Sequence, residues 1–270
     1  MTAAPAAAVQ PRKAFVASIM GMPISVHVRG PQARGTRVAA AVERSFDALR
    51  ADEALFSTFL PDSEVSRIRR GELSQHRADP RVREVARLCR RAAALTGGAF
   101  SAHLPGPDGR RVFDPTGIVK GWSVDSALAG LLTELATLDA HDVLICAGGD
   151  IAAACLRSDT PDWRVGIEDP RDAGRVLRVV SLRTGGVATS GTAARGHHII
   201  DPATGTPAAD DLLSATVVGP TLTWADVHAT AAFVRGRQAA AWLAGLGEYG
   251  AVLLTSDDRL ITVGDGFETP

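Results

Sequence analysis

The order of apolar patterns along this 270-residue chain constrains its fold more than any other feature. Segments with the spacing of amphipathic helices occur in mixed order with segments that alternate like strands. They do not follow the strict strand–helix–strand alternation that produces a parallel sheet. The expected helices are 36–56, 82–95, 124–138 and 224–243, and the expected strands are 16–28, 142–146, 163–167, 176–182, 214–218, 251–254 and 259–263. This order predicts an α+β fold with mixed sheets and helices.

Four segments lack a clear helical or strand period. Residues 1–13 are rich in Ala and Pro, which predicts a disordered tail. Residues 56–63 form an expected loop, 101–119 a long loop with three prolines and three glycines, and 185–207 a turn-rich stretch. Because long loops in compact domains are often functional, the loop 101–119 is a candidate for a functional role.

The composition excludes several classes of protein. A hydrophobic fraction of 46% with 22% charged residues is typical of globular proteins and not of disordered ones. The formal net charge is −1 and no basic run occurs, so nucleic acid is not an expected partner. No stretch approaches the roughly 20 apolar residues of a membrane span, so stable membrane insertion is not expected.

The cysteines and the first residues favour a reducing compartment. Cys89, Cys146 and Cys155 are odd in number and form no CxxC pair, which indicates neither a disulfide framework nor a zinc site. The basic residues Arg12 and Lys13 follow the alanines, whereas a secretory signal places its positive charge first. We therefore expect a cytoplasmic protein.

The segment Thr223–Thr230 carries the clearest chemical signal. Asp226 and Thr230 lie four residues apart in an expected helix, so their Cβ atoms share one face about 5–6 Å apart. A carboxylate and a hydroxyl so placed suit Mg²⁺, which prefers oxygen ligands. His198, upstream in a polar turn, offers a group for acid–base work near neutral pH. A metal and a base together suggest phosphoryl chemistry.

Each of these residues also has an ordinary structural interpretation. Asp226 is then an exposed helical carboxylate, and Thr230 a hydroxyl bonded back to its own helix. His198 is then a turn histidine, and spacing alone does not choose between it and the adjacent His197.

Three further segments are ambiguous. Gly148-Gly149-Asp150 follows a strand. Its glycines either let a ligand approach the backbone or form a plain turn, and the segment is not a GxGxxG motif. Thr189-Ser190-Gly191 offers hydroxyls and amides to a phosphate, although Ser-Gly turns are frequent. Lys120 is placed to meet a phosphate and Asp125 to accept hydrogen bonds from a ribose or a base; alternatively they are a charged pair around a helix start.

Taken together, eight segments in chain order resemble motifs of the FAD:protein FMN transferases, the ApbE family. They are Met20-Gly21, 56–67, 96–101, 119–125, 147–150, 188–191, 198–205 and 225–230, and they extend over about 18–235. The chain departs from the family pattern at Met22, where Thr is usual, and at Arg69, where Asn is frequent. Ser101 replaces an Asp, which removes a carboxylate, and 102–116 is shortened.

The resemblance implies a fold and an activity. The fold is a single compact α+β domain over 14–270 with T-fold-like architecture. The activity is Mg²⁺-dependent transfer of FMN from FAD to a Ser or Thr hydroxyl of an acceptor protein, with release of AMP. The partners are thus FAD and a flavin-acceptor protein.

The resemblance also implies roles for individual residues. His198 is the candidate base, and Mg²⁺ is held by Asp226, Thr230 and the backbone carbonyl of Leu128. The residues expected to contact FAD are Met20, Phe59, Ala99, Phe100, Ser101, Lys120, Asp125 and Ile200.

Two other functions remain open from the sequence. In an FAD pyrophosphatase, water would attack at the same site and give FMN and AMP. A flavin-binding protein without turnover would hold FAD and release no AMP, and the loss of a carboxylate at Ser101 keeps this alternative in view.

Overall fold

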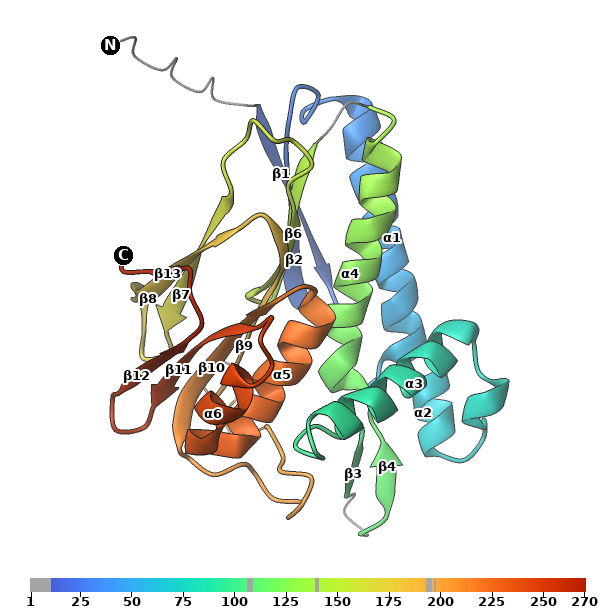
Figure 1. The fold of residues 1–270 in the computed structure, drawn as a ribbon. Helices are drawn as coiled ribbons and strands as arrows, with labels where there is room; N and C mark the ends of the chain where they lie inside the picture. The colour runs from blue at the N-terminus through green and yellow to red at the C-terminus, as the bar shows by residue number, and fades with distance from the viewer. Residues whose placement is uncertain (1–10, 106–108, 139–140, 193–195, 197) are drawn as a thin grey trace.

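An eight-stranded antiparallel sheet with helices on one face forms the centre of the computed structural model (Figure 1). The structure describes residues 11–270 except 106–108, 139–140, 193–195 and 197. The strand order is β1-β2-β5-β6-β9-β10-β11-β12, and a three-stranded sheet, β13-β8-β7, covers part of the other face. Strands β3 and β4 form a separate hairpin.

The elements follow one another in mixed order, as the apolar patterns predict. The strands are β1 (Arg12–Ile19), β2 (Met22–Arg29), β3 (His103–Pro105), β4 (Arg111–Phe113), β5 (Asp142–Ala147), β6 (Asp150–Ala154), β7 (Trp163–Asp169), β8 (Asp172–Leu182), β9 (Thr184–Gly191), β10 (Leu212–Gly219), β11 (Gly250–Thr255), β12 (Leu260–Val263) and β13 (Phe267–Glu268). The helices are α1 (Thr36–Phe56), α2 (Glu64–Arg69), α3 (Pro80–Leu95), α4 (Thr116–Leu135), α5 (Leu222–Arg235) and α6 (Ala239–Ala244), with short 3-10 helices at Gln75–Arg77 and Gly236–Gln238.

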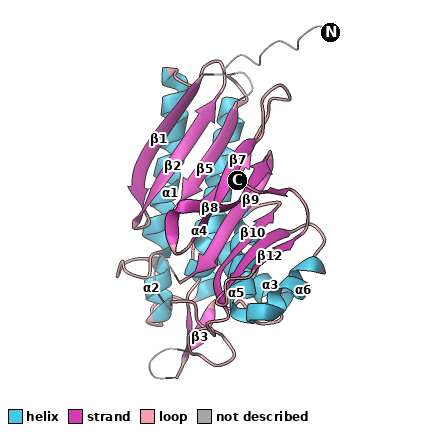
Figure 2. Cartoon of the chain, turned by 90° about the vertical axis from the view of Figure 1, so that its left-hand side faces the viewer, coloured by secondary structure: helices cyan, strands magenta, loops and turns pink. Residues whose placement is uncertain are grey.

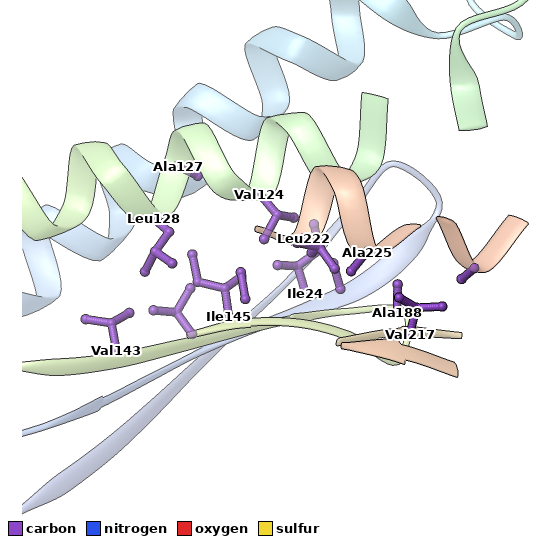
Figure 3. Packing of buried hydrophobic residues seen from close by; sticks show 14 of the residues in the cluster. Ile24, Val124, Ala127, Leu128, Val143, Ile145, Ala188, Val217, Leu222 and Ala225 are labelled. Atoms are coloured by element: carbon purple, nitrogen blue, oxygen red, sulfur yellow. The ribbon is translucent and has the colours of Figure 1, made fainter. Parts of the chain in front are cut away.

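The layering follows from strands that bury both of their faces. In β5, Val143 and Ile145 point to the helix layer, where they pack with Val124 and Leu128 of α4 (Figure 3). Leu144, between them in sequence, points the other way because successive strand residues face opposite sides. The apolar run at 142–146 is therefore continuous, as expected for a strand covered on both sides.

The small sheet packs against the face that the helices leave free (Figure 2). In β7, buried and exposed residues alternate strictly from Trp163 to Asp169. Trp163 and Val165 belong to one buried cluster with Leu144 of the large sheet and Val180 of β8. This alternation is the signature of a strand with one face in the core and one in solvent.

A second hydrophobic core lies between α2, α3 and the ends of α4 and α5. Phe56 at the end of α1 meets Trp122 of α4 edge to face, with 5.5 Å between the ring centroids. Val227 of α5 joins the same cluster, while Ala225 of α5 belongs to the cluster on the large sheet. Helices α4 and α5 are thus fixed from two sides, which makes them a rigid support for functional side chains.

Helices α4 and α5 approach each other closely at Gly121. A Cβ atom at this position would lie 2.9 Å from the Cα of Thr223, so only glycine allows the contact. Asp125, one turn further along α4, accepts hydrogen bonds from the backbone N–H groups of Leu222 and Thr223 at 3.1 and 2.8 Å. It thereby satisfies N–H groups that the start of α5 leaves unpaired.

Several predictions from the sequence are confirmed. The α+β class is correct, and the helix predicted over 36–56 matches the bounds of α1. The strands near 142–146, 163–167, 176–182 and 214–218 and the C-terminal hairpin are all present. Among the described residues, no helix has the length and apolar character needed to cross a membrane.

Other predictions are corrected. The strand expected over 16–28 is a hairpin, because Met20 and Gly21 adopt φ of 55° and 70° and turn the chain. Its first strand begins at Arg12, inside the segment predicted as a tail, while residues 1–10 lie outside the described chain. The helix expected over 224–243 breaks at Gly236, which has a φ of 58°.

Two segments expected to be irregular contain regular structure. The stretch 101–119 holds the β3–β4 hairpin and the first turn of α4. The turn-rich stretch that was expected to begin near Gly185 opens instead with β9, where Gly186 lies close to α5 and Gly185 close to the backbone of Gly219 in β10. A Cβ atom at Gly186 would lie 2.3 Å from the Cα of Leu222, so the small residues there allow close packing and do not signal a turn.

Candidate active site

Three charged side chains from separate elements meet beside the start of β6. Lys120 of α4 forms ion pairs with Asp150, the first residue of β6, and with Asp226 of α5, where the Lys120 Nζ to Asp226 Oδ2 distance is 3.4 Å. Both carboxylates are buried, whereas the lysine side chain is 25% exposed. The cluster is therefore accessible to solvent from the side of the lysine.

The turn between β5 and β6 places Asp150 in this cluster. Gly148 and Gly149 adopt φ of 58° and 98°, which L-residues with side chains rarely adopt. A Cβ atom at Gly148 would also lie 2.9 Å from the Met22 sulfur. Asp150 Oδ1 accepts a hydrogen bond from the backbone N–H of Thr189 at 3.0 Å, which fixes the carboxylate against β9.

Hydroxyl groups line the sheet side of the cluster. Thr230, one turn after Asp226 on α5, lies with its Oγ1 3.2 Å from the Oγ of Ser190 on β9. The hydroxyls of Thr189 and Thr216, which lie 2.9 Å apart, point to the other face of the sheet because successive strand residues alternate. Asp226 is buried and Thr230 faces a hydroxyl of the sheet, so the ordinary interpretation of an exposed Asp and a back-bonded Thr does not describe this helix.

The electrostatics keep Lys120 charged. Burial by itself lowers the pKa of the lysine, but the carboxylates of Asp226 and Asp150 outweigh this effect and hold the pKa above its usual value. The three side chains together carry two negative charges and one positive charge. The cluster therefore has one net negative charge available to a bound cation.

The donor set fits a hard cation. Asp226 and Thr230 offer a carboxylate and a hydroxyl on one face of α5, and Asp150 offers a second carboxylate nearby. Among the described residues, no group of three or more His, Cys, Asp or Glu side chains is arranged to hold a metal. A cation here would thus keep positions for waters or for phosphate oxygens, which is how Mg²⁺ usually binds.

A cavity of about 430 Å³ lies at the C-terminal part of α5. Val234, one turn after Thr230, lines it together with two residues predicted to contact FAD, Ala99 and Ser101. The remaining lining residues are Ala93, Gly97, Gly98, Arg111, Asp201, Pro202, Ala203 and Arg235. Thr230 and Val234 share a face of α5, so this side of the cavity lies about 6 Å along the helix from the hydroxyl end of the charged cluster.

The residues predicted to contact FAD differ in which of their groups a ligand can reach. The Phe100 side chain is 3% exposed and packs in the second core beside Gly117, so only its backbone can meet a ligand. Met20, in the β1–β2 turn, packs against both cores. Phe59 is 94% exposed on the loop before α2. An aromatic ring so exposed is free to stack on a planar ligand.

His198 and Ile200 lie in the loop that follows β9. The His198 ring is exposed, and its Nδ1 lies 3.0 Å from the carbonyl oxygen of Gly196. Ile200 pairs with Pro207 in an isolated bridge, and Asp201 just after it lines the cavity. His197 lies outside the described residues, so the geometry does not choose between the two histidines.

The structure does not bring Asp125 and Leu128 to the Lys120 cluster. Both carboxylate oxygens of Asp125 accept hydrogen bonds from the start of α5. Leu128 lies eight residues beyond Lys120, about 12 Å further along the helix axis. Its side chain packs in the core (Figure 3). Its carbonyl lies inside α4, where a regular helix pairs it with the N–H group four residues further on.

Two residues of the site were not singled out by the sequence. Asp150 provides the ion pair to Lys120, and Ser190 provides the partner of Thr230. Both lie in segments that the sequence marks as ambiguous, 148–150 and 189–191. For Asp150 the signal was a carboxylate two glycines after a buried strand, and for Ser190 a hydroxyl beside a glycine; the partner of each could not be inferred without the tertiary fold.

Comparisons with known proteins all lead to one family. A family model described as "ApbE family" matches residues 20–105 and 104–253. An FAD:protein FMN transferase of Treponema pallidum is 39% identical over 127 residues, which cover 40% of this chain and 35% of that protein. The same-named protein of Vibrio cholerae is 29% identical over 183 residues, covering 64% of this chain and 51% of the relative. The chain thus matches about half or less of the length of these relatives.

Solved structures show the same fold. An ApbE protein from Thermotoga maritima superposes with a TM-score of 0.79 at 20% identity, covering 94% of this chain and 97% of that one. A flavin transferase ApbE from Vibrio cholerae gives a TM-score of 0.77 at 21% identity, covering 94% and 98%. At these identities the likeness concerns the fold alone.

The charge balance of the cluster predicts the effect of removing its lysine. Lys120→Met leaves Asp150 and Asp226 without their counter-charge, so the variant should lose about 3 kcal/mol of unfolding free energy near neutral pH. Because the two carboxylates then repel each other without a counter-charge, the loss should be smaller at about pH 5 than at neutral pH. Denaturant titration at both pH values measures this.

A double variant provides the control. Lys120→Met with Asp150→Asn removes one of the two carboxylates and should recover part of the lost stability. A Lys120→Met protein as stable as the wild type at both pH values would contradict the proposed balance of charge.

Proposed function

The chain belongs to the ApbE family, and from that premise we propose that it transfers FMN from FAD to a Ser or Thr hydroxyl of an acceptor protein. In this reaction the phosphoanhydride bond of FAD breaks. The acceptor oxygen forms a new bond to the phosphorus of FMN, and AMP leaves with the bridging oxygen. The hydroxyl proton passes to a base.

The observation that carries this proposal is the Lys120–Asp150–Asp226 cluster beside Thr230 and the cavity. The pyrophosphate of FAD is doubly negative, and attack on it is slow unless its charge is neutralised. Phosphoryl transfer depends mainly on positioning and electrostatic stabilisation. Lys120 can position the pyrophosphate, and the carboxylates beside it can hold a cation that neutralises its charge.

Asp226 and Thr230 would hold Mg²⁺, since they present a carboxylate and a hydroxyl from one helical face. When bound, the ion would polarise the phosphoryl group and neutralise charge on the leaving group. We do not include the carbonyl of Leu128 in this set, because it lies inside α4 and far along the helix. Asp150 is the second carboxylate near the proposed ion.

Lys120 would orient the pyrophosphate. Its ammonium has three N–H donors, and one of them points to the carboxylate of Asp150 in the ion pair. A phosphate oxygen can accept from another donor without breaking this ion pair. Because the lysine is partly exposed, a ligand can reach it from solvent.

His198 is the proposed base for the acceptor hydroxyl. Its exposed position in the loop before the cavity residue Asp201 suits a group that must meet a second protein. A base so placed typically contributes about 10²–10⁴-fold to the rate. Phe59, exposed on the loop before α2, would stack on the flavin or the adenine.

We also propose that the protein works in the cytoplasm. Cys89, Cys146 and Cys155 are all unpaired, which suits a reducing compartment.

The reaction product tests the proposal. A purified chain with FAD, Mg²⁺ and an acceptor protein should release AMP and give an acceptor that stays fluorescent for flavin after denaturation. Mass spectrometry should find the mass of an FMN phosphoester on one Ser or Thr. The label should survive denaturant because it is covalent.

The same experiment separates the alternatives. Free FMN with AMP and no modified acceptor would replace the transferase by an FAD pyrophosphatase, in which water attacks at the same site. Tight FAD binding without AMP would indicate a flavin-binding protein without turnover.

The metal assignment predicts graded losses. Asp226→Ala should reduce Mg²⁺-dependent AMP release to background while leaving the fold intact, because the carboxylate is the stronger ligand. Thr230→Ala should reduce it less completely, since a neutral hydroxyl binds the ion more weakly. Asp47→Ala, which removes an exposed carboxylate of α1, serves as the control and should behave like the wild type. Wild-type activity of Asp226→Ala at every Mg²⁺ concentration would overturn the assignment.

The base assignment predicts a different pattern. His198→Ala should slow transfer about 10²–10⁴-fold and leave FAD affinity nearly unchanged, because a base acts in the transition state. His197→Ala should have a mild effect. Single-turnover rates and an FAD titration measure both quantities. Reversed effects of the two substitutions would assign the base to His197.

A further inference from the structure

Helix α3 has an exposed face made of arginines. It contains five arginines and one acidic residue, Glu84. Its buried face consists of Val82, Val85, Ala86, Cys89 and Ala92. On the opposite face lie Arg83, Arg87, Arg90 and Arg91, which we call the α3 arginine face, and all four are exposed. The spacing i, i+4, i+7 and i+8 places them on one side of the helix.

These arginines lack the acidic partners that other exposed arginines have. Among the residues that the structure describes, none of the four lies within ion-pair distance of a carboxylate; Arg83 reaches only the carbonyl of His76 at 3.4 Å. By contrast Arg50, Arg164 and Arg259 each contact a carboxylate at 3.2 Å or less. With only one acid, Glu84, on the exposed side of the helix, the α3 face is a positive surface on a chain whose net charge is −1.

The α3 arginine face leads to the cavity of the candidate active site. Leu95, one turn after Arg91, is 49% exposed at the end of the helix. The next residues, Gly97 and Gly98, line the cavity, as does Ala93 within the last turn. Arg91 also lies over the ring of Trp224 on α5, 5.0 Å from its centroid, so the face is anchored to the helix of Asp226.

The spacing of the arginines matches an extended peptide. Arg83, Arg87 and Arg91 rise about 6 Å from one to the next along the helix. Alternate side chains of an extended chain are separated by about 6.6 Å and point to the same side. A peptide lying along α3 can thus place acidic side chains opposite successive arginines, whereas a single phosphate meets only one or two of them.

We propose that the α3 arginine face binds an acidic, extended segment of the flavin-acceptor protein and directs its hydroxyl residue into the cavity. This inference rests on the proposed transfer reaction, for which it names the property of the acceptor that is recognised. The exposed Leu95 provides an apolar contact where the peptide passes from the helix to the cavity. Complementary charge of this kind accelerates association and selects the partner.

The test uses the full chain and a defined probe. The probe is a fluorescein-labelled peptide with one threonine flanked on both sides by alternating Asp or Glu and small residues. Its control is the same peptide with Asn and Gln in place of the acids. Fluorescence anisotropy should show binding of the acidic peptide alone, weakening as salt is raised.

The variant Arg83→Gln, Arg87→Gln, Arg90→Gln should weaken this binding roughly tenfold, since each exposed charge contributes a modest amount. Arg91 is retained because it also packs on Trp224. The matched control, Arg50→Gln, Arg164→Gln, Arg259→Gln, removes the same charge elsewhere and should bind like the wild type. Equal binding by both variants would overturn the inference, as would a DNA duplex that displaces the peptide and binds more tightly through the same arginines.

Transfer to the same peptide separates this inference from the proposed function. If the acidic peptide binds through the arginines but neither it nor any protein acceptor is flavinylated by the wild type, the transferase proposal fails and the acidic docking face stands. If acceptors are flavinylated by the wild type and by the arginine variant with equal kcat/KM, the docking proposal fails and the transferase stands.

Discussion

The close approach of α4 and α5 is the contact on which the site depends. Gly121 lets the two helices meet at the backbone of Thr223, and Asp125 holds the start of α5 through two backbone hydrogen bonds. Lys120 lies next to this contact and Asp226 follows it by one turn, so both side chains are fixed by the same junction. Burial raises the pKa of Asp125, while the hydrogen bonds from Thr223 and Leu222 act in the opposite direction. A carboxyl with this role serves the site by positioning α5.

The net charge of the Lys120–Asp150–Asp226 cluster arises because the fold brings α4, α5 and β6 together. Two strands and two helices contribute Asp150, Ser190, Lys120 and Asp226, and no single segment holds more than a part of the set. Within the trio of charged groups the lysine compensates one carboxylate and leaves the other for a cation. The cavity at the end of α5 is also lined by Ala93, Gly97 and Gly98, at the end of the helix that carries the α3 arginine face. A pyrophosphate would thus meet Lys120, whereas an acidic partner protein would meet the α3 arginine face. The substrate and the partner are recognised at different places.

The sequence predicts those features that depend on local periodicity. Helix α1 was predicted correctly because its buried residues recur at helical spacing, and the shared face of Asp226 and Thr230 follows from their four-residue separation. The pairing of Lys120 with Asp150 could not be predicted, because it depends on a glycine turn that brings β6 beside α4. The roles of Asp125 and Leu128 rest on the motif resemblance alone; the fold adds that Asp125 holds the start of α5 and that the Leu128 side chain packs in the core. Gly185 and Gly186 suggested a turn, but they pair with β6 as strand residues, and Gly186 is also the point where β9 meets α5.

A crystal structure of the protein grown with FAD and Mg²⁺ tests the central claim most directly, because the claim concerns where the pyrophosphate and the ion bind. The account predicts the ion on Asp226 and Thr230, the pyrophosphate within hydrogen-bond distance of Lys120 Nζ, and one end of FAD in the cavity lined by Ala99 and Ser101. FAD bound elsewhere, for instance in the smaller cavity of about 340 Å³ between β8, β10 and β13, with Lys120 still held between Asp150 and Asp226, would contradict it.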